Sequence, residues 1–248
     1  MTRTLIFRRL YFRSRAVISR PMELEILLPE ELPVMTLPNV TFFPQALMPL
    51  HIFEPRYRQM LKDVLATNRL FAVAGLNEKL LGQSDQVEPP HRIASVGIVR
   101  ACQKNPDDTS NLLLQGLCRV ELLEIVSNDP YRRVRARALL SQDGGAPDDN
   151  LRLRSELARL ITLKQKLGGT LQPEITNFLR TVEDPETFVD LAAFSLCDDQ
   201  PFKQKLLETL DIHARLALFS AQLRSEIDAL KLQKKLQGRL PDERITEN

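Results

Sequence analysis

The strongest constraint on the fold is a change of pattern near the middle of the chain. Before it, short apolar runs of strand length are broken by turns. After it, apolar residues follow helical spacing. The change falls at SQDGGAPDDN, residues 141–150, where glycines, a proline and aspartates mark a loop or linker. The pattern predicts an α+β protein with a β-rich lobe over residues 22–140, a linker at 141–150 and an α-helical bundle over 151–240, followed by a tail at 241–248.

The first half contains several segments of strand length. Turn chemistry separates them at NPDDTSN, residues 105–111, and at SNDP, residues 127–130. Such short links favour an antiparallel, meander-like sheet. The four clearest segments begin at Arg92, Asn111, Arg119 and Tyr131.

One helix is predicted in this half, and it begins inside the stretch FFPQALMPLHIFEPRY that starts at Phe42. Pro55 suits a first helical turn, where its missing N–H costs nothing, and Glu54 complements the positive end of the helix dipole. The apolar residues that follow recur at the spacing of a buried helical face: Tyr57, Met60, Leu61, Val64 and Leu65.

The second half is predicted to be helical throughout. A helix runs from Leu151 to the glycines at 168–169, and a long one runs from after Asp211 to about Gln237. At about 1.5 Å per residue the long helix measures about 38 Å, so its far end is expected to project beyond the bundle. Shorter helices are expected to start around Pro173, Pro185 (capped by Asp184) and Pro201.

Positive charge is concentrated at the amino terminus. The formal net charge is +2, but the first twenty residues hold six arginines and no acid, which leaves 28 basic and 32 acidic residues in the rest. Residues 1–21 are predicted to be a basic leader, either disordered or upstream of a true start at Met22, with organelle targeting as the alternative. The remainder lacks the bulk charge of a nucleic-acid binder, and its apolar runs are far shorter than the roughly 20 residues needed to span a membrane.

The three cysteines, Cys102, Cys118 and Cys197, are odd in number and have no close pair. This pattern indicates neither a disulfide framework nor a metal site. Buried, reduced thiols in a cytoplasmic protein are expected.

The order of these segments resembles the amino-terminal, substrate-binding domain of the Lon family of ATP-dependent proteases. The resemblance begins at ELPVMTLPNVTFFPQALMPLHIFEPRYRQML, continues through SVGIVRACQ, LLLQGLCRVELLEIV and PYRRVRARAL, and closes with VEDPETFVDLAAFSL, KQKLLETLDIHARL and LRSEIDALKLQKKLQ. The IFEPRY version is most similar to stand-alone members. For the fold, the resemblance implies a PUA-like pseudobarrel joined to a helical bundle with one long helix.

Two motifs of the full-length proteases are missing from the sequence. It contains no Gly-x-x-x-x-Gly-Lys-Ser/Thr phosphate loop and no peptidase serine motif. We therefore expect a non-enzymatic chain without a cofactor. The resemblance implies binding of unfolded or tagged polypeptide, as a substrate-recognition module or an adaptor for a separate ATP-dependent protease.

The candidate polypeptide-binding residues lie in and after the opening apolar stretch. Most apolar residues there are expected to form core, and any exposed ones would offer a patch for extended polypeptide. The candidates are Phe42, Phe43, Met48, Phe53, Glu54, Arg56 and Arg58.

Two alternatives remain open at this stage. Arg133, Arg135 and Arg137 alternate along one strand and share a face, which could bind RNA or a phosphate ligand. Solvent-facing charge is the more common explanation, and no aromatic residue interleaves with them. A hydrolase site at His51 would need partners that the other two histidines do not supply by spacing.

Overall fold

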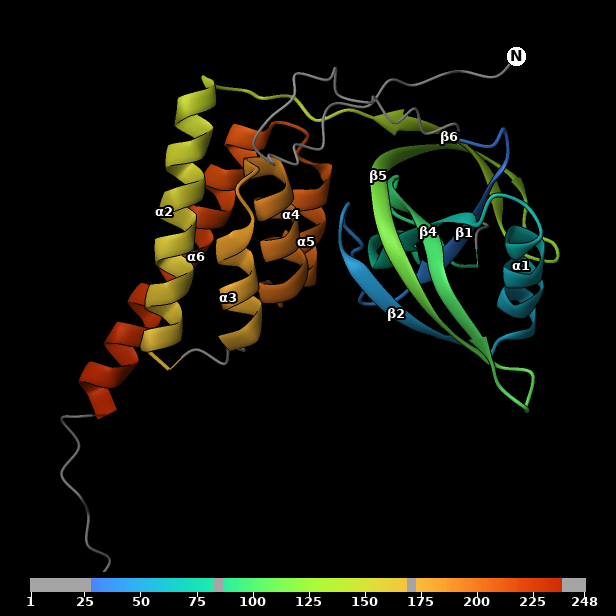
Figure 1. Ribbon diagram of the computed structural model, residues 1–248, viewed down its shortest axis with the longest axis horizontal. Coiled ribbons are helices and arrows are strands. Elements are labelled where there is room, and N and C mark those ends of the chain that lie inside the picture. The colour runs from blue at the N-terminus through green and yellow to red at the C-terminus, as the bar shows by residue number, and fades with distance from the viewer. Residues whose placement is uncertain (1–27, 83–86, 169–172, 238–248) are drawn as a thin grey trace, which may run out of the picture.

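The computed structural model describes residues 28–82, 87–168 and 173–237, so the predicted leader and the tail at 241–248 lie outside the described residues. A β-barrel with one flanking helix lies beside a bundle of helices (Figure 1). The predicted α+β class, with the strands first and the helices second, is confirmed.

Six strands form the barrel. They are ordered β2-β5-β4-β3-β1-β6, and a further pairing of β5 with β6 closes the strands from β5 to β6 into a ring, which leaves β2 at the edge beside β5. Neighbouring strands are antiparallel except β1 and β3, which are parallel. The strands are β1 (Leu32–Leu37), β2 (Leu47–Ile52), β3 (Leu70–Gly75), β4 (Ile93–Lys104), β5 (Ser110–Ser127) and β6 (Arg133–Leu139).

The long strand β5 corrects one prediction. The segments expected to begin separately at Asn111 and Arg119 form one strand of 18 residues. Its first part pairs with β2 and its last part with β6, while β4 pairs along both. Gly116, at the junction, permits a close approach of backbones and makes no turn: an added Cβ would lie 2.1 Å from the carbonyl oxygen of Phe43.

The helix of the first half is α1 (Pro55–Leu65), as predicted. Its face of Tyr57, Met60, Leu61 and Val64 is buried against the barrel core. A short 3-10 helix, η1 (Glu78–Leu80), follows β3.

The bundle begins earlier than predicted. The first helix starts at Pro147 and not at Leu151, because Asp148 and Asp149 in its first turn suit the positive end of the helix dipole. Asp184 and Asp199 cap two later helices by accepting hydrogen bonds from Thr187 and Phe202 backbone N–H groups. The helices are α2 (Pro147–Lys166), α3 (Pro173–Thr181), α4 (Pro185–Leu196), α5 (Gln200–Glu208) and α6 (Ile212–Gln237).

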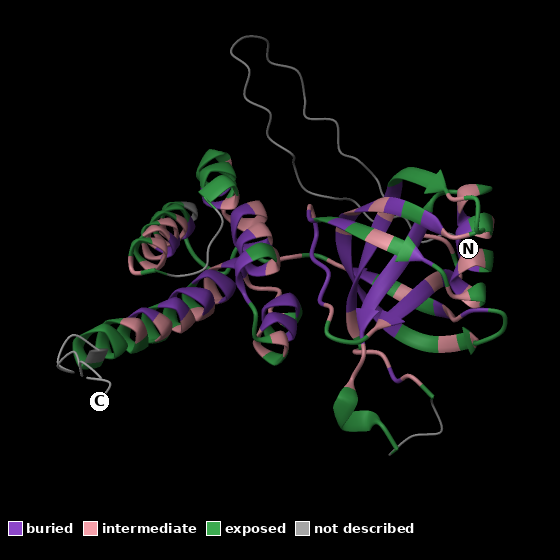
Figure 2. Ribbon diagram, turned by 90° about the horizontal axis from the view of Figure 1, so that it is seen from below, coloured by how far each residue is buried: buried purple, intermediate pink, exposed green. Residues whose placement is uncertain are grey.

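The longest helix, α6, extends past the end of α2 (Figure 1). Leu223 and Ile227 are buried in the bundle, whereas every residue from 231 to 236 is exposed (Figure 2). The predicted projection of this helix is confirmed.

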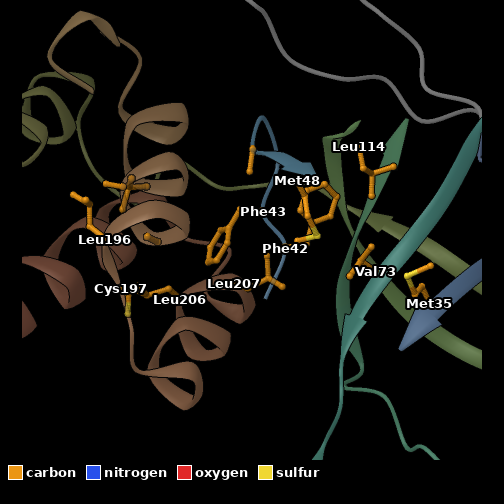
Figure 3. Close-up of a cluster of buried hydrophobic side chains, with 14 of the residues drawn as sticks. Met35, Phe42, Phe43, Met48, Val73, Leu114, Leu196, Cys197, Leu206 and Leu207 are labelled. Atoms are coloured by element: carbon orange, nitrogen blue, oxygen red, sulfur yellow. The ribbon is translucent and has the colours of Figure 1, made fainter. Parts of the chain in front are cut away.

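One hydrophobic core runs through both lobes. Figure 3 shows Phe43 reaching from the segment before β2 toward Leu206 and Leu207 of α5. The ring of Phe42 meets that of Phe194 on α4 edge to face, with centroids 6.4 Å apart. The barrel and the bundle therefore share apolar burial across their junction.

This burial corrects part of the predicted binding set. Phe42, Phe43 and Met48 are only 1%, 0% and 7% exposed. The two phenylalanines join the lobes, and Met48 faces the barrel interior near Leu114 (Figure 3). None of the three is available as a surface contact, because the core of this chain already uses their apolar area.

Candidate functional site

The outer face of β2 carries the exposed part of the apolar stretch. Leu47 and Phe53 are 52% and 61% exposed, and Pro49 and His51 between them are also exposed. The alternate residues of the strand point to the core side. We call Leu47, Pro49, His51 and Phe53 the β2 face.

The β2 face lies on an edge strand. Among the described residues β2 pairs only with β5, in an antiparallel register that sets His51 opposite Asn111. The Nδ1 atom of His51 lies 2.8 Å from the side-chain oxygen of Asn111, and the His51 ring stacks on Phe53 with centroids 6.0 Å apart. These contacts hold the two rings flat on the surface, next to a strand edge that has backbone groups free to pair.

The predicted charged residues lie around the start of α1. Arg56 donates hydrogen bonds to Glu54 at 2.9 Å and to both oxygens of Glu88 at 2.7 and 2.9 Å. The bond from Arg56 holds the pKa of Glu88 below its ordinary value. Arg58 is half-buried on the same helix. The pKa of Asp108 is lowered chiefly by the hydrogen bond from Lys104, and the positive charge of Arg58 lowers it further. Arg56 is thus occupied by carboxylates, and Phe53 is the member of the predicted set that offers a free apolar surface.

The arginine strand β6 has the predicted alternation, since Arg135 and Arg137 are exposed while Val134 and Ala138 on the other face are buried. Each of the three arginines pairs with a glutamate. Arg133 lies 3.0 Å from Glu31 and Arg135 3.0 Å from Glu124, and Arg137 pairs with Glu121. Each arginine of this face is therefore paired with a carboxylate of this chain, and Glu121 is shared with Arg92.

A buried ionic cluster connects the two lobes, and the sequence analysis did not single it out. Arg119 on β5 binds Asp190 on α4 through two hydrogen bonds of 2.8 and 2.7 Å, and Arg215 on α6 binds the same carboxylate at 2.7 Å. All three side chains are at most 2% exposed. The signal in the sequence is a charged residue inside an apolar run, as in LCRVELL around Arg119 and FVDLAAF around Asp190.

Other chemistry was looked for in the described parts of the chain. Within residues 28–82, 87–168 and 173–237, no group of three or more His, Cys, Asp and Glu side chains is placed to hold a metal ion. None of the helices in these ranges combines the length and the apolar character needed to cross a membrane. Cys118 and Cys197 are buried as expected, whereas Cys102 is exposed, which corrects the expectation for that thiol.

The comparisons with known proteins decide the family. The model of the ATP-dependent protease La (LON) substrate-binding domain matches residues 31–224. The chain belongs to the LON substrate-binding domain family. The family match spans the barrel and most of the bundle, so the shared core and the ionic cluster both lie inside the LON domain.

Several curated relatives are Lon proteases. The one from Dictyoglomus thermophilum is 26% identical over 87% of this chain and 27% of its own length. The one from Heliobacterium modesticaldum is 28% identical over 85% of this chain and 26% of its own length. This LON chain spans about a quarter of the length of these relatives.

Solved structures show the same fold. The N-terminal domain of the Mycobacterium avium complex Lon protease has a TM-score of 0.60 and 15% identity, and the match covers 78% of this chain and 98% of that one. The Lon N-terminal domain protein from Xanthomonas campestris has a TM-score of 0.56 and 20% identity, over 77% of this chain and 97% of that one. The barrel and bundle described here are thus the LON amino-terminal fold.

Proposed function

We propose that this chain is a non-catalytic module that recognises polypeptide substrates for a Lon-type ATP-dependent protease. Membership of the substrate-binding domain family supports the class of ligand. The observation that carries the proposal is the β2 face, where Leu47 and Phe53 each leave more than half of their surface in water. Exposed apolar side chains gathered on one strand favour contact with apolar segments that a folded client would bury.

The edge position of β2 supports binding of an extended segment. A polypeptide laid along β2 would place alternate side chains against Leu47 and Phe53 and its backbone against the free edge. Pro49 lacks an N–H, so this edge offers fewer donors than an ordinary strand. Side-chain contact therefore carries more of the binding in this proposal than the backbone does.

The proposed role for the rest of the chain is that of an adaptor. A separate ATP-dependent protease is the partner proposed to act on the bound polypeptide, and the Lon proteases among the relatives support that class of partner. The bundle and the projecting end of α6 would support the barrel or dock on that partner.

The test is fluorescence anisotropy of a labelled, permanently unfolded protein titrated with the full chain. The double variant Leu47→Ser, Phe53→Ser should bind about thirtyfold more weakly, because each truncation removes about 1 kcal/mol of partly exposed apolar contact and each 1.4 kcal/mol is a factor of about ten in affinity. The matched control is Leu123→Ser, which changes another half-exposed leucine, on β5. Equal binding by the double variant and the wild type would overturn the proposal for the β2 face.

The same titration with a labelled RNA oligomer distinguishes polypeptide binding from the alternative function, RNA binding. Glu31, Glu121 and Glu124 pair with the three arginines of β6, and this pairing disfavours RNA as the ligand. Binding to RNA alone, lost as salt rises and abolished by alanine at Arg133, Arg135 and Arg137, would replace the polypeptide proposal with RNA binding.

A further inference from the structure

A cavity of about 380 Å³ lies where β1, the first turn of α1 and the turn between β5 and β6 meet. This volume is in the lower part of the range for small-ligand sites. Val34 and Val87 give the cavity an apolar side. Its other lining side chains are polar: Thr36, Arg56, Tyr57, Asn128 and Arg132.

Arg132 is the unusual residue of this cavity. It is half-buried, and its hydrogen bonds all go to neutral oxygens. Its Nε donates to Asn128 Oδ1 at 2.9 Å, and its Nη1 donates to Thr36 Oγ1 at 2.9 Å and to the Glu88 carbonyl at 2.5 Å. Within the described part of the chain, Arg132 makes no direct hydrogen bond or ion pair with a carboxylate, and its Nη2 has no hydrogen bond. Burial lowers the pKa of Arg132, and the charge of the nearby Glu88 carboxylate only partly offsets this effect. A partly buried cation normally has an anionic partner, because removing its water costs energy that neutral acceptors only partly restore.

The neighbouring arginine shows the contrast. Arg56 binds two carboxylates, with both oxygens of Glu88 on one side and Glu54 on the other. The Glu88 carboxylate therefore accepts its hydrogen bonds from Arg56, while Arg132 is hydrogen-bonded to the Glu88 backbone carbonyl and interacts with the carboxylate only through its charge. Tyr57 is also fixed, since its hydroxyl donates to the Thr36 carbonyl at 3.2 Å. These hydrogen bonds fix the Arg56 and Tyr57 side chains of the cavity lining, which leaves the Nη2 atom of Arg132 as the unbonded donor.

We propose that this cavity binds a carboxylate that carries a short apolar group. The carboxylate would accept hydrogen bonds from the free Nη2 of Arg132, and the apolar group would lie against Val87, the exposed apolar residue of the lining. Two sources share this chemistry: the carboxyl end of a polypeptide with an apolar last residue, and a free small branched acid. The site involves none of the residues of the β2 face, so its test is independent of the test of the proposed function.

The test uses the full chain labelled with nitrogen-15 and follows the arginine Nε–Hε resonances by NMR. Three probes are titrated: isovalerate, a short acetylated peptide ending in leucine with a free carboxylate, and the same peptide with a carboxamide end. We expect the free-acid peptide to shift the Arg132 resonance and to bind at least tenfold more tightly than the amide. Binding of isovalerate without the peptide would support the site as one for a small acid. Equal binding of acid and amide peptides, or no binding of either acid, would overturn the proposal.

Variants locate the site. Arg132→Gln should weaken acid binding at least tenfold, whereas Arg135→Gln, on the exposed face of β6, should leave it unchanged. Because Arg132 also donates a hydrogen bond to Thr36, replacing it can disturb the fold. A second pair of variants therefore tests the site without changing Arg132. Val87 is 88% exposed, and its change to Glu or to Lys should not disturb the core. Val87→Glu should weaken binding several-fold and Val87→Lys should strengthen it. Identical affinities for these two charge variants would contradict the site.

Discussion

Arg119 Nη2 lies 2.7 Å from Asp190 Oδ1, although the two residues are 71 positions apart in the sequence and belong to different lobes. Arg215 binds the same oxygen of Asp190, and Arg119 also donates to the Leu207 carbonyl at 3.0 Å. One carboxylate thus holds the barrel strand β5 against the two helices α4 and α6. The junction between the lobes is fixed by charge as well as by the shared apolar core.

Replacing Asp190 should destabilise the whole chain. Asp190→Ala leaves two buried guanidinium groups without their main anion, so we expect a loss of about 3–5 kcal/mol in the free energy of unfolding. Urea unfolding followed by circular dichroism measures it. The control is Asp228→Ala on α6, which removes an exposed partner of Lys231 and should cost less than about 0.5 kcal/mol. A loss below about 1 kcal/mol for Asp190→Ala would show that the cluster is not tightly buried.

The pair of Glu88 and Arg56 should make stability depend on pH in the acid range. Because the pKa of Glu88 is lowered below its ordinary 4.5 in the folded state, its contribution is present above that pH and is lost as pH falls through the folded pKa. Glu88→Gln should cost up to about 1 kcal/mol at neutral pH, with a difference from wild type that shrinks toward about pH 3. Urea unfolding of both proteins across this pH range measures the difference in their free energies of unfolding. A difference that does not change with pH would contradict the prediction.

Gly116 should tolerate no side chain. It approaches the segment before β2, where Gly116 N–H donates to the Ala46 carbonyl at 2.9 Å and Gln45 N–H donates to the Gly116 carbonyl at 2.9 Å. Gly116→Ala forces these backbones apart and should cost about 3 kcal/mol in thermal or urea unfolding. Gly116→Ser should cost more. Wild-type stability in the alanine variant would mean that the strands lie further apart than described here.

The three thiols should react at very different rates. Cys102 is exposed on β4, whereas Cys118 and Cys197 are buried, and burial raises the pKa of Cys118 to about 12. Because the thiolate is the reactive form, a disulfide reagent should modify one thiol quickly in the native chain and all three in urea. Cys102→Ser should abolish the fast phase. A second fast thiol would contradict the packing around β5 or α4.

Local signals in the sequence were sufficient to predict the helices and the strands β4 and β6, whereas β3 was not singled out. Pro55 and Asp184 identify helix starts, and the i, i+3, i+4 spacing identifies the buried face of α1. The single strand β5 was harder to predict, since Gly116 and Arg119 interrupt its apolar pattern for reasons that arise from distant parts of the chain. Gly116 faces Phe43, and Arg119 faces Asp190.

The candidate surface was predicted only in part for a similar reason. In FFPQALMPLHIF nearly every residue is apolar, so period-two alternation does not separate the core side from the water side. Phe42 and Phe43 pack at a junction whose other wall is more than 140 residues away in the sequence, at Phe194. The polar His51 and the proline at 49 were the available sign that the odd-numbered residues of β2 face water.

The fixed base of α6 has a mechanical consequence. Arg215 ties the first turns of this helix to the barrel through Asp190, while residues 231–236 at its other end stand free of the bundle. A helix of 26 residues is about 39 Å long, so a tilt of about 10° at the base moves its tip by about 7 Å. Because α6 is packed into the bundle as far as Ile227, any rotation of the bundle relative to the barrel about the Asp190 carboxylate would be carried along the helix to its exposed end.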